Sequence, residues 1–397
     1  MAFATLLSGC ATTGTPETVR AVDRATFVPS TTAAAATPLA APASVVPLVE
    51  KRRKRRGPPA AAVGVQFHGL WSSYSDRDRA VALDRIAAMG ARWVRIDISW
   101  AMLQPNPGAI DARGWGPQFI DHVISMAHAR GLRVLGTFWL TPGWANGYAG
   151  ERVAPRDPAT YGRAFAWAAR RWAGKVQAWE AWNEPNSGDF LVGADPTTYT
   201  RLLCAAYRST QALPGPAPAR VVYGGTMHND VPWIARTYRA GAKGCFDVMA
   251  THPYQSPSGT SPLSGRGTSI WEFQHLRAVR ALMVRNGDRR PVWLTEFGWS
   301  SHANTGREAG WEQGVTEAQQ ASFTVAALRT LRQRYPWVRR AFLYTDRANP
   351  GEGVHQAGFG LMTNDLRPKP VYHAVRSWVR SNPPWLRYLP RKVGRTG

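Results

Sequence analysis

Two glutamates stand where buried segments of this chain end. Glu184 lies just after the apolar and aromatic run "VQAWEAW" and directly before Pro185, and Glu296 lies within "PVWLTEFGWS". A glutamate in such a setting is costly to bury unless its charge or its proton is used. Two carboxyl groups on either side of one bond are the minimum that glycoside hydrolysis needs, because one donates a proton and the other stabilises or attacks the sugar carbon. The pair therefore points to this chemistry if the fold brings the two side chains together.

Short apolar segments recur along the chain and could position the two glutamates. Eight of them are rich in β-branched and aromatic residues, as β-strands are, and cover residues 63–71, 92–100, 133–140, 176–184, 220–226, 246–254, 291–300 and 341–346. Segments with helical periodicity lie between them, at 78–89, 119–129, 161–172 and 197–210. This alternation predicts an α/β fold, a (β/α)8 TIM barrel. An open doubly wound sheet is the alternative, but no glycine-rich phosphate loop follows the first segment.

The carboxyl ends of barrel strands carry the chemistry in such a fold. Because Glu184 and Glu296 end the fourth and seventh segments, we expect them to face each other across the barrel mouth. The other strand ends supply the polar and aromatic side chains that a sugar site needs, since sugars offer hydroxyl groups and apolar C–H faces. The candidate sugar-binding residues are His68, Arg95, Trp139, Asn183, His252, Tyr254, Trp299 and Tyr344.

The motifs "WNEPN" at the fourth segment and "LTEFGWS" at the seventh resemble those of the clan A retaining glycoside hydrolases, the 4/7 superfamily. The chain is most similar to family 39 and to the cellulase-like family 5 proteins of actinobacterial type. Further likeness lies in "RWVRIDISWAMLQPNPG", "THPY" and "GLMTNDLRPKPVYHAV", and the resemblance extends over roughly residues 63–378.

The resemblance implies a role for each residue that matches the family's motifs. Glu184 would be the general acid/base and Glu296 the nucleophile. Asn183 would hydrogen-bond the sugar 2-hydroxyl group, and Tyr254 and Arg95 would hold the nucleophile ionised and oriented. His252 and Trp299 would lie beside the reacting groups, in roles that the resemblance leaves open.

The chain departs from the family pattern in two places. Tyr344 ends the eighth segment, where the clan often has a tryptophan as a sugar platform, and "FWLTPGW" replaces a histidine near the third. Both departures leave the identity of the sugar open. We expect a retaining glycosidase that cleaves O-glycosidic bonds of a β-linked oligo- or polysaccharide by double displacement. The alternatives are a surface-anchored polysaccharide-binding protein that has lost turnover and an envelope-glycan transglycosylase.

Several of the site residues also have purely structural interpretations, among them Glu296 as a buried salt-bridge partner and His252 and Tyr254 as ordinary residues of the core rim. Glu184 could begin a helix, because Pro185 suits a first turn and acidic groups favour helix starts. Arg95 could form an ion pair with Asp97 or with a neighbouring strand. The second glutamate motif makes the catalytic interpretation of Glu184 the stronger one.

Other chemistries find little support in the sequence. The chain has nine histidines but no HExxH motif and no cysteine cluster, so we expect no metal and no cofactor. Serine hydrolase chemistry is disfavoured because no G-x-S-x-G occurs. The formal net charge of +23 suits an anionic partner or simply solubility, and nucleic-acid binding would rest on this charge alone. We therefore expect a monomer that binds a carbohydrate and no nucleic acid.

The chain outside the predicted barrel has the composition of a tether. We expect a lipobox-like or truncated signal segment over residues 1–10, where "LLSGC" ends at Cys10, and then a disordered linker over 11–61. The run "KRRKRR" at 51–56 could associate with a membrane or cell wall, which predicts an extracytoplasmic protein, secreted or anchored as a lipoprotein. The barrel is expected over 62–381 and a basic tail over 382–397. Cys204 and Cys245 could form a disulfide or remain two buried thiols.

Overall fold

The computed structural model describes residues 59–215 and 219–384 of the chain. The lipobox-like segment at Cys10, the expected linker as far as residue 58 with its basic run, and the tail beyond residue 384 lie outside the described residues. The first strand begins at Ala62 and the last helix ends at Ser381. None of the helices in the described residues has both the length and the apolar character that crossing a membrane requires.

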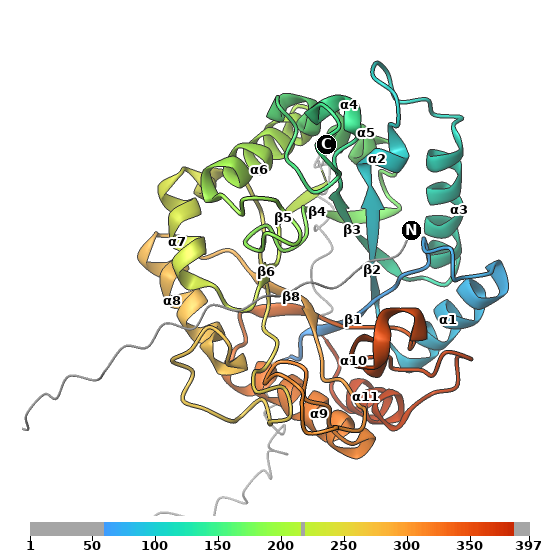
Figure 1. Ribbon diagram of the computed structural model, residues 1–397, viewed down its shortest axis with the longest axis vertical. Coiled ribbons are helices and arrows are strands. Elements are labelled where there is room, and N and C mark those ends of the chain that lie inside the picture. Colours follow the sequence, from blue (N-terminus) through green and yellow to red (C-terminus); the bar gives the residue numbers. More distant parts are fainter. Residues whose placement is uncertain (1–58, 216–218, 385–397) are drawn as a thin grey trace, which may run out of the picture. The chain divides into compact units, whose positions relative to one another are not determined.

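One parallel sheet of nine strands runs through the described residues (Figure 1). The strands are β1 (Ala62–Gln66), β2 (Trp93–Ser99), β3 (Arg133–Trp139), β4 (Val176–Ala181), β5 (Arg220–Tyr223), β6 (Thr226–Met227), β7 (Met249–His252), β8 (Val292–Phe297) and β9 (Val338–Leu343). Their order in the sheet is β5-β4-β3-β2-β1-β9-β8-β7-β6. Each predicted strand segment overlaps one or two of these strands.

The two ends of this sheet meet, which closes it into a barrel. β5 and β6 are separated only by Gly224 and Gly225, so together they fill the position of a single barrel strand. Val222 of β5 forms a bridge with Val248, directly before β7, and the Tyr223 amide donates to the Val248 carbonyl at 2.9 Å. The predicted (β/α)8 barrel is confirmed, with its fifth strand broken into two short parts.

Helices surround the strands in Figure 1. The longer ones are α1 (Asp76–Met89), α3 (Trp115–Ala129), α5 (Pro158–Arg171), α6 (Pro196–Gln211), α7 (Val231–Arg239), α8 (Leu276–Arg285), α9 (Glu317–Arg334) and α11 (Pro370–Ser381). Short helices are α2 (Trp100–Leu103), α4 (Gly143–Asn146) and α10 (Gly353–Gly358), with 3-10 turns at Ala242–Gly244, Phe273–His275 and Pro350–Glu352.

Several helices begin at a polar residue that caps them. The Ser75 side chain accepts a hydrogen bond from the Asp78 amide and the Asp78 carboxylate accepts one from the Ser75 amide, a capping box at the start of α1. The side chains of Asp157 and Asp195 accept a backbone amide at the starts of α5 and α6, and each aspartate is followed by a proline. Proline suits a first turn because the amide that it lacks would have no partner there. These caps fix where each strand-to-helix loop ends.

The inside of the barrel is filled with aromatic rings toward the end where the strands begin. Trp93 of β2 packs edge-on against Trp293 of β8 at 5.4 Å and against Phe342 of β9 at 6.3 Å, and all three side chains are buried. Smaller apolar residues from the other strands complete this cluster. Side chains rather than a pore therefore occupy this end, as is usual for such barrels, and the two glutamates lie near the opposite end.

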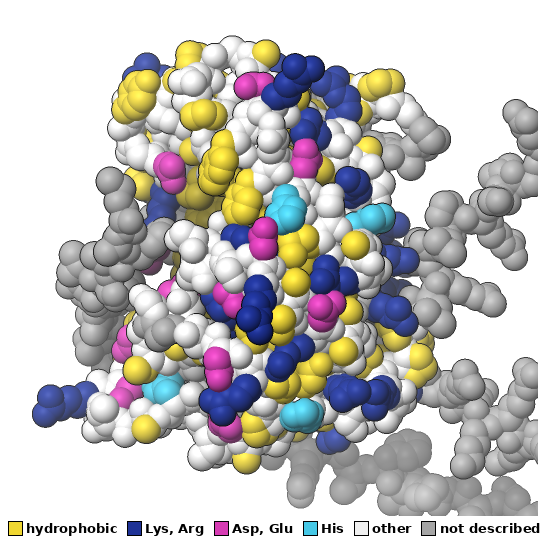
Figure 2. All heavy atoms as spheres, turned by 90° about the vertical axis from the view of Figure 1, so that its right-hand side faces the viewer, with side chains coloured by type: hydrophobic (Ala, Val, Ile, Leu, Met, Phe, Trp, Pro, Cys, Tyr) yellow, Lys and Arg dark blue, Asp and Glu magenta, His cyan; other side chains and the backbone are white. Residues whose placement is uncertain are grey.

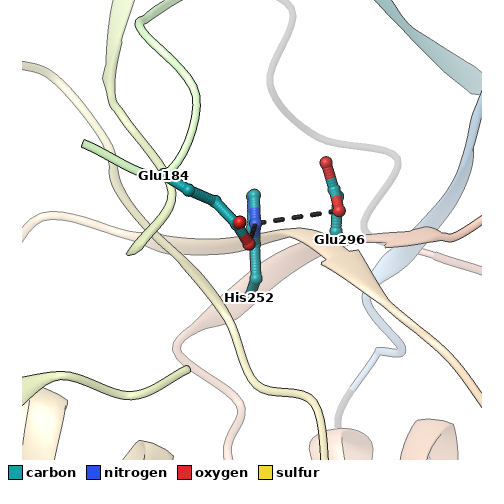
Figure 3. Close-up of side chains that lie close together, drawn as sticks. All are labelled: Glu184, His252 and Glu296. Carbon is teal, nitrogen blue, oxygen red and sulfur yellow. Dashed lines mark hydrogen bonds and ion pairs between the residues drawn. The ribbon is translucent and has the colours of Figure 1, made fainter. Parts of the chain in front are cut away.

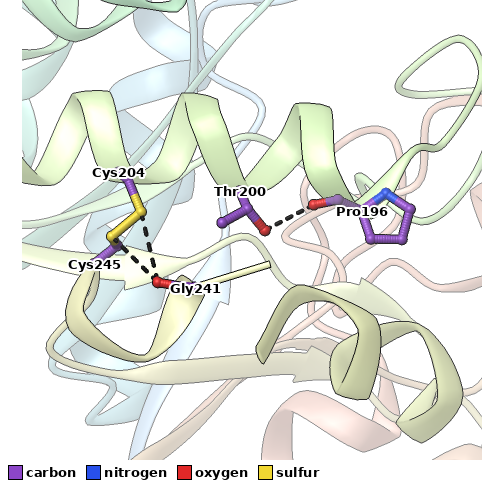
Figure 4. Close-up of a disulfide and its surroundings, with 5 residues drawn as sticks. All are labelled: Pro196, Thr200, Cys204, Gly241 and Cys245. Carbon is purple, nitrogen blue, oxygen red and sulfur yellow. Dashed lines mark hydrogen bonds between the residues drawn. A yellow bond between two sulfur atoms is a disulfide. The ribbon is translucent and has the colours of Figure 1, made fainter. Parts of the chain in front are cut away.

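The structure decides between the two interpretations of the cysteines. Cys204 of α6 and Cys245 form a disulfide with a Cα–Cα distance of 4.7 Å, and both residues are buried. Figure 4 shows the two sulfur atoms beside the carbonyl oxygen of Gly241, at 4.0 and 3.8 Å. The bond ties α6 to the segment that leads into β7.

Replacing both cysteines with alanine (Cys204→Ala/Cys245→Ala) should lower the free energy of unfolding by about 2–4 kcal/mol, because the disulfide restricts the unfolded chain. Chemical denaturation without reductant measures this. The wild-type protein in excess dithiothreitol serves as the matched control and should show the same lowered midpoint. Equal midpoints for the oxidised wild type and the variant would contradict a formed disulfide.

Candidate active site

The two glutamates lie together at the carboxyl ends of the strands, where they were expected. Glu296 is the fifth residue of β8, and Glu184 follows the end of β4 by three residues. Figure 3 shows their carboxyl groups on either side of the His252 ring. One carboxylate oxygen of each glutamate and one ring nitrogen of His252 all lie within 4.8 Å of one another. Nδ1 of His252 is 2.7 Å from Oε1 of Glu184 and 3.8 Å from Oε2 of Glu296.

An unusual turn after β4 places Glu184. Trp182 has a φ of 74° and Glu184 a φ of 41°, both in the left-handed region that residues other than glycine seldom adopt. The Trp182 amide donates to the Phe138 carbonyl and the Glu184 amide to the Gly225 carbonyl, each at 3.0 Å. The neighbouring strands therefore hold the turn in place from both sides. Backbone strain of this kind concentrates at functional sites.

Arg95 is the centre of the polar network beneath the glutamates. It is fully buried on β2 and donates four hydrogen bonds through its guanidinium group. Nε donates to Glu180 at 2.7 Å, and Nη1 donates to Gln66 at 2.8 Å and to Glu296 at 2.6 Å. Nη2 donates to Oδ1 of Asn183 at 2.7 Å, so the amide nitrogen of Asn183, which has no partner among the described residues, can donate to a ligand. Arg95 thus orients the carboxylate that the sequence assigned as nucleophile.

The structural interpretation of Arg95 also holds in part. Glu180 belongs to β4, so the Arg95–Glu180 contact is an ion pair with another strand, and Asp97 lies 3.9 Å from Nη1 of Arg95. A fully buried guanidinium needs such compensation for its charge. The same side chain therefore stabilises the barrel and positions the site.

Glu180 is a part of the site that the sequence analysis missed. It is fully buried and accepts hydrogen bonds from Arg95, from the Thr137 hydroxyl at 2.8 Å and from the Gly225 amide at 3.1 Å. Its signal was available, because a glutamate in the middle of an apolar strand, four residues before Glu184, has to find partners inside the fold. These three partners are all donors, and Arg95 supplies a positive charge beside the carboxyl group.

The surroundings of the two carboxyl groups differ, and the difference separates their roles. Burial raises the pKa of Glu184 to about 8, with Arg95 opposing this rise and Glu180 adding to it. Burial also raises the pKa of Glu296, while the positive charge of Arg95 acts against the rise. Glu296 alone accepts two strong donors, Arg95 and the Tyr254 hydroxyl at 2.9 Å, and both favour its ionised form. We therefore assign the proton to Glu184 and the negative charge to Glu296.

His252 fits this assignment as a neutral ring. Burial lowers its pKa below the ordinary value for histidine. Nε2 lies 3.0 Å from the Thr295 hydroxyl, and Nδ1 faces Glu184. A protonated Glu184 can donate to Nδ1 while Nε2–H donates to Thr295, which satisfies every atom of the contact. His252 thus positions the acid.

His68 and Tyr344 continue the site beyond Tyr254. Tyr344 packs edge-on against Tyr254 at 6.4 Å and against His68 at 5.5 Å. His68 stacks on Trp71 at 3.7 Å, and its Nδ1 lies 3.6 Å from Asp97. Its Nε2 is buried without a partner among the described residues, so it can bind a substrate hydroxyl group.

The two remaining candidates differ in their placement. Trp139 is half-buried at the end of β3 beside Phe190, at 5.9 Å, and its Nε1 has no partner within the described part of the chain. Trp299 is only 2% exposed and donates from Nε1 to the Thr260 carbonyl at 2.9 Å. Its ring packs against Phe323 of α9, at 6.0 Å. The structure therefore buries Trp299 in the core and does not bring it to the two glutamates.

Glu184, His252 and Glu296 are also the residues that could hold a metal ion in the described part of the chain. Their contacts do not favour this use. Oε1 of Glu296 already accepts from the guanidinium of Arg95, whose positive charge would repel a cation. Oε1 of Glu184 is taken up by His252. The arrangement suits proton transfer and nucleophilic attack better than metal binding.

Comparisons with known proteins found similar solved structures, but no matching family model and no matching curated protein. A family 39 glycoside hydrolase from Bacteroides cellulosilyticus WH2 is 21% identical, with a TM-score of 0.60 over 80% of this chain and 63% of that one. A GH39 enzyme from Xanthomonas axonopodis pv. citri is 21% identical (TM-score 0.61, 82% and 67%). A monomeric beta-xylosidase from Caulobacter crescentus CB15 is 20% identical (TM-score 0.59, 82% and 70%).

The likeness to these structures confirms the fold that the motifs predicted. The chain spans about two thirds of the length of these structures, from 63% to 70%. The function of this chain therefore has to be inferred from its own candidate active site.

Replacing Arg95 with methionine (Arg95→Met) should lower the free energy of unfolding by about 3–5 kcal/mol, because it leaves the buried carboxyl groups of Glu180 and Glu296 without their cation. The neighbouring Arg92 is exposed, so Arg92→Met is a matched control that should change stability by at most about 0.5 kcal/mol. Equilibrium denaturation compares the two. Equal stability of the two variants would show that Glu180 and Glu296 do not depend on Arg95 for their stability.

Proposed function

We propose that this protein is a retaining glycoside hydrolase that cleaves O-glycosidic bonds of a β-linked oligo- or polysaccharide by double displacement. One observation carries the proposal: a carboxylate oxygen of Glu184 and one of Glu296 lie within 4.8 Å of each other at the barrel mouth. Retaining enzymes hold their carboxyl groups about 5–5.5 Å apart, whereas inverting enzymes leave about 6.5–9.5 Å for a water molecule. The shared fold with glycoside hydrolases supports the same reaction class.

The protonation states give the order of steps. Glu184 keeps its proton at neutral pH because burial raises its pKa to about 8, and it donates this proton to the leaving oxygen. Glu296, held by Arg95 and Tyr254, attacks the anomeric carbon and forms the glycosyl-enzyme. The ester no longer carries a negative charge, so the pKa of Glu184 falls and its carboxylate can take a proton from water. The water attacks the same carbon and frees Glu296.

Exposed aromatic side chains near the barrel mouth favour a substrate of several sugars. Tyr148 after β3 is 83% exposed, Trp115 at the start of α3 is 70% exposed, and Trp271 and Trp311 in the loops after β7 and β8 are 44% and 39% exposed. Large rings are costly to leave in water, and they stack on the apolar faces of sugars. Their positions on several separate segments suit a chain of sugars more than a single one.

The two alternative functions use the same residues. A binding protein without turnover would not need an acid and a nucleophile with opposite protonation states, so the intact network disfavours it. Transglycosylation differs only in the acceptor of the second step, and the products of a glycan panel distinguish it from hydrolysis. The disulfide also supports our proposal that the protein works outside the cytoplasm, where disulfides persist.

Two substitutions test the roles of the glutamates. With a poor leaving group, Glu184→Gln should lower kcat by about 10²–10⁴-fold, because the leaving oxygen then departs without a proton. With a dinitrophenyl β-glycoside, which needs no proton, Glu184→Gln should still form the glycosyl-enzyme, whereas Glu296→Gln should be inactive on both substrates. Glu317→Gln, an exposed position on α9, is the matched control and should keep wild-type activity. A fluoro-sugar inactivator should label Glu296, and a Glu296→Gln variant with most of its rate intact would refute the proposal.

The pH profile gives an independent test of the acid. Because the pKa of Glu184 is about 8 and its protonated form is the active one, kcat/KM should fall as the pH rises above about 8. Stopped assays from pH 4 to 10 on an aryl glycoside measure this. The Glu184→Gln variant should lose the alkaline limb while its protein remains folded by circular dichroism. A wild-type profile that stays flat to pH 10 would contradict the assignment of the acid.

A further inference from the structure

A second polar region lies at the opposite end of the barrel, where the strands begin. It is a cavity of about 470 Å³ lined by residues at or before the starts of β5, β7, β8 and β9 and by residues of α8. Six of its described lining residues are arginines: Arg220, Arg280, Arg289, Arg290, Arg339 and Arg340. We call this the arginine pocket. The catalytic chemistry proposed above makes no use of it.

Arg340 forms part of the wall of the arginine pocket and lies over its aromatic floor. Its guanidinium carbon is 4.6 Å from the ring centre of Trp93 and 4.7 Å from that of Trp293. Its Nε is buried without a partner among the described residues, and Nη1 has only the Arg339 carbonyl, at 3.4 Å. Burial and the neighbouring arginines lower the pKa of Arg340 to about 9. The positive charge of Arg340 is therefore held by rings and is not neutralised by a carboxylate of the described chain.

The acidic residues close to the arginine pocket already have partners. Asp247 is the one acidic residue among the described lining residues, and its Oδ2 accepts from the Val221 amide at 2.8 Å. Asp288 pairs with Arg290 at 3.2 Å and accepts from the Tyr238 hydroxyl at 2.8 Å. Arg280, Arg289 and Arg340 form no ion pair with a carboxylate of the described residues, so the arginine pocket keeps an excess of positive charge.

The arginine pocket differs from the general basic surface of the protein. On the face that carries α1 and α3, Lys and Arg side chains lie interspersed with Asp and Glu (Figure 2). A mixed surface of that kind needs no bound partner. In the arginine pocket, like charges from several separate elements converge on one space, and a bound anion would offset their mutual repulsion.

We propose that the arginine pocket is a binding site for a phosphate group, either a free phosphate ester or a phosphodiester of a polymer. Guanidinium groups bind phosphate through paired N–H donors, and several of them can share the oxygens of one group. The volume exceeds that of a single phosphate, and Trp337 also lines it, so there is room for an attached organic part. A ligand held here would sit at the far end of the barrel from the two glutamates. The site does not depend on the proposed hydrolysis.

Isothermal titration calorimetry of the full chain at fixed ionic strength tests this site. The probes are glycerol 3-phosphate, the diester glycerophosphoglycerol and, as an anion without phosphate, acetate. We expect saturable binding of at least one phosphate compound and none of acetate. Tighter binding of the monoester would identify free phosphate esters as the source, and tighter binding of the diester would identify a polymer. Absence of saturable binding by both phosphate compounds would overturn the proposal.

Matched variants distinguish binding in the arginine pocket from attraction by the overall charge of the protein. Arg280→Gln/Arg289→Gln should weaken binding at least about tenfold, because it removes two of the donors around the anion. Arg113→Gln/Arg307→Gln changes the net charge equally at two exposed positions outside the arginine pocket and should leave the affinity within about twofold. A third variant, with residues 51–56 changed to glutamine, should also bind normally. Equal loss of affinity in the pocket and control variants would show diffuse attraction and refute the site, and all variants should keep wild-type melting temperature and glycosidase activity.

Discussion

The buried positive charge of Arg95 is the constraint on which the rest of the site depends. A guanidinium group without access to water has to be surrounded by acceptors, and four side chains from β1, β4, the turn after β4 and β8 supply them. Glu180 forms an ion pair with this guanidinium and accepts two further hydrogen bonds inside the barrel. Glu296 shares the same cation but also faces the barrel mouth. The network therefore holds Glu180 as a structural counter-ion and leaves Glu296 at the barrel mouth, where the proposed reaction needs an ionised carboxylate.

The position of Glu184 depends on backbone geometry more than on charge. The turn after β4 lifts Glu184 out of the strand, and Gly225 accepts its amide proton across the break in the fifth strand. A side chain on Gly225 would collide with His252 and Thr295, so glycine is required there for the ring to lie beside Glu184. The interruption between β5 and β6 is thus the space in which His252 sits. The acid acquires its high pKa in this way, because it is enclosed by an uncharged ring and the backbone.

The sequence contained enough to predict the barrel and the two glutamates, because both depend on local patterns. The periodic spacing of apolar residues indicates the strands and helices. Each glutamate ends a strand segment inside a recognisable motif. Trp299 could not be placed in this way, because it follows the last residue of β8 by two positions and alternation no longer holds outside a strand. The break in the fifth strand was also missed, since two adjacent glycines fit a turn as well as an interrupted strand. The arginine pocket had no local signal, because its residues come from distant segments that meet only when the ring closes.

The aromatic packing at the beginning of the strands limits the routes by which molecules can reach the two glutamates. Trp93, Trp293 and Phe342 fill the lumen below Arg95, so nothing passes through the barrel from one side to the other. The glutamates can then exchange reactants with bulk solvent through a single opening. In the reaction proposed above, the departing sugar fragment and the incoming water would therefore have to share that opening.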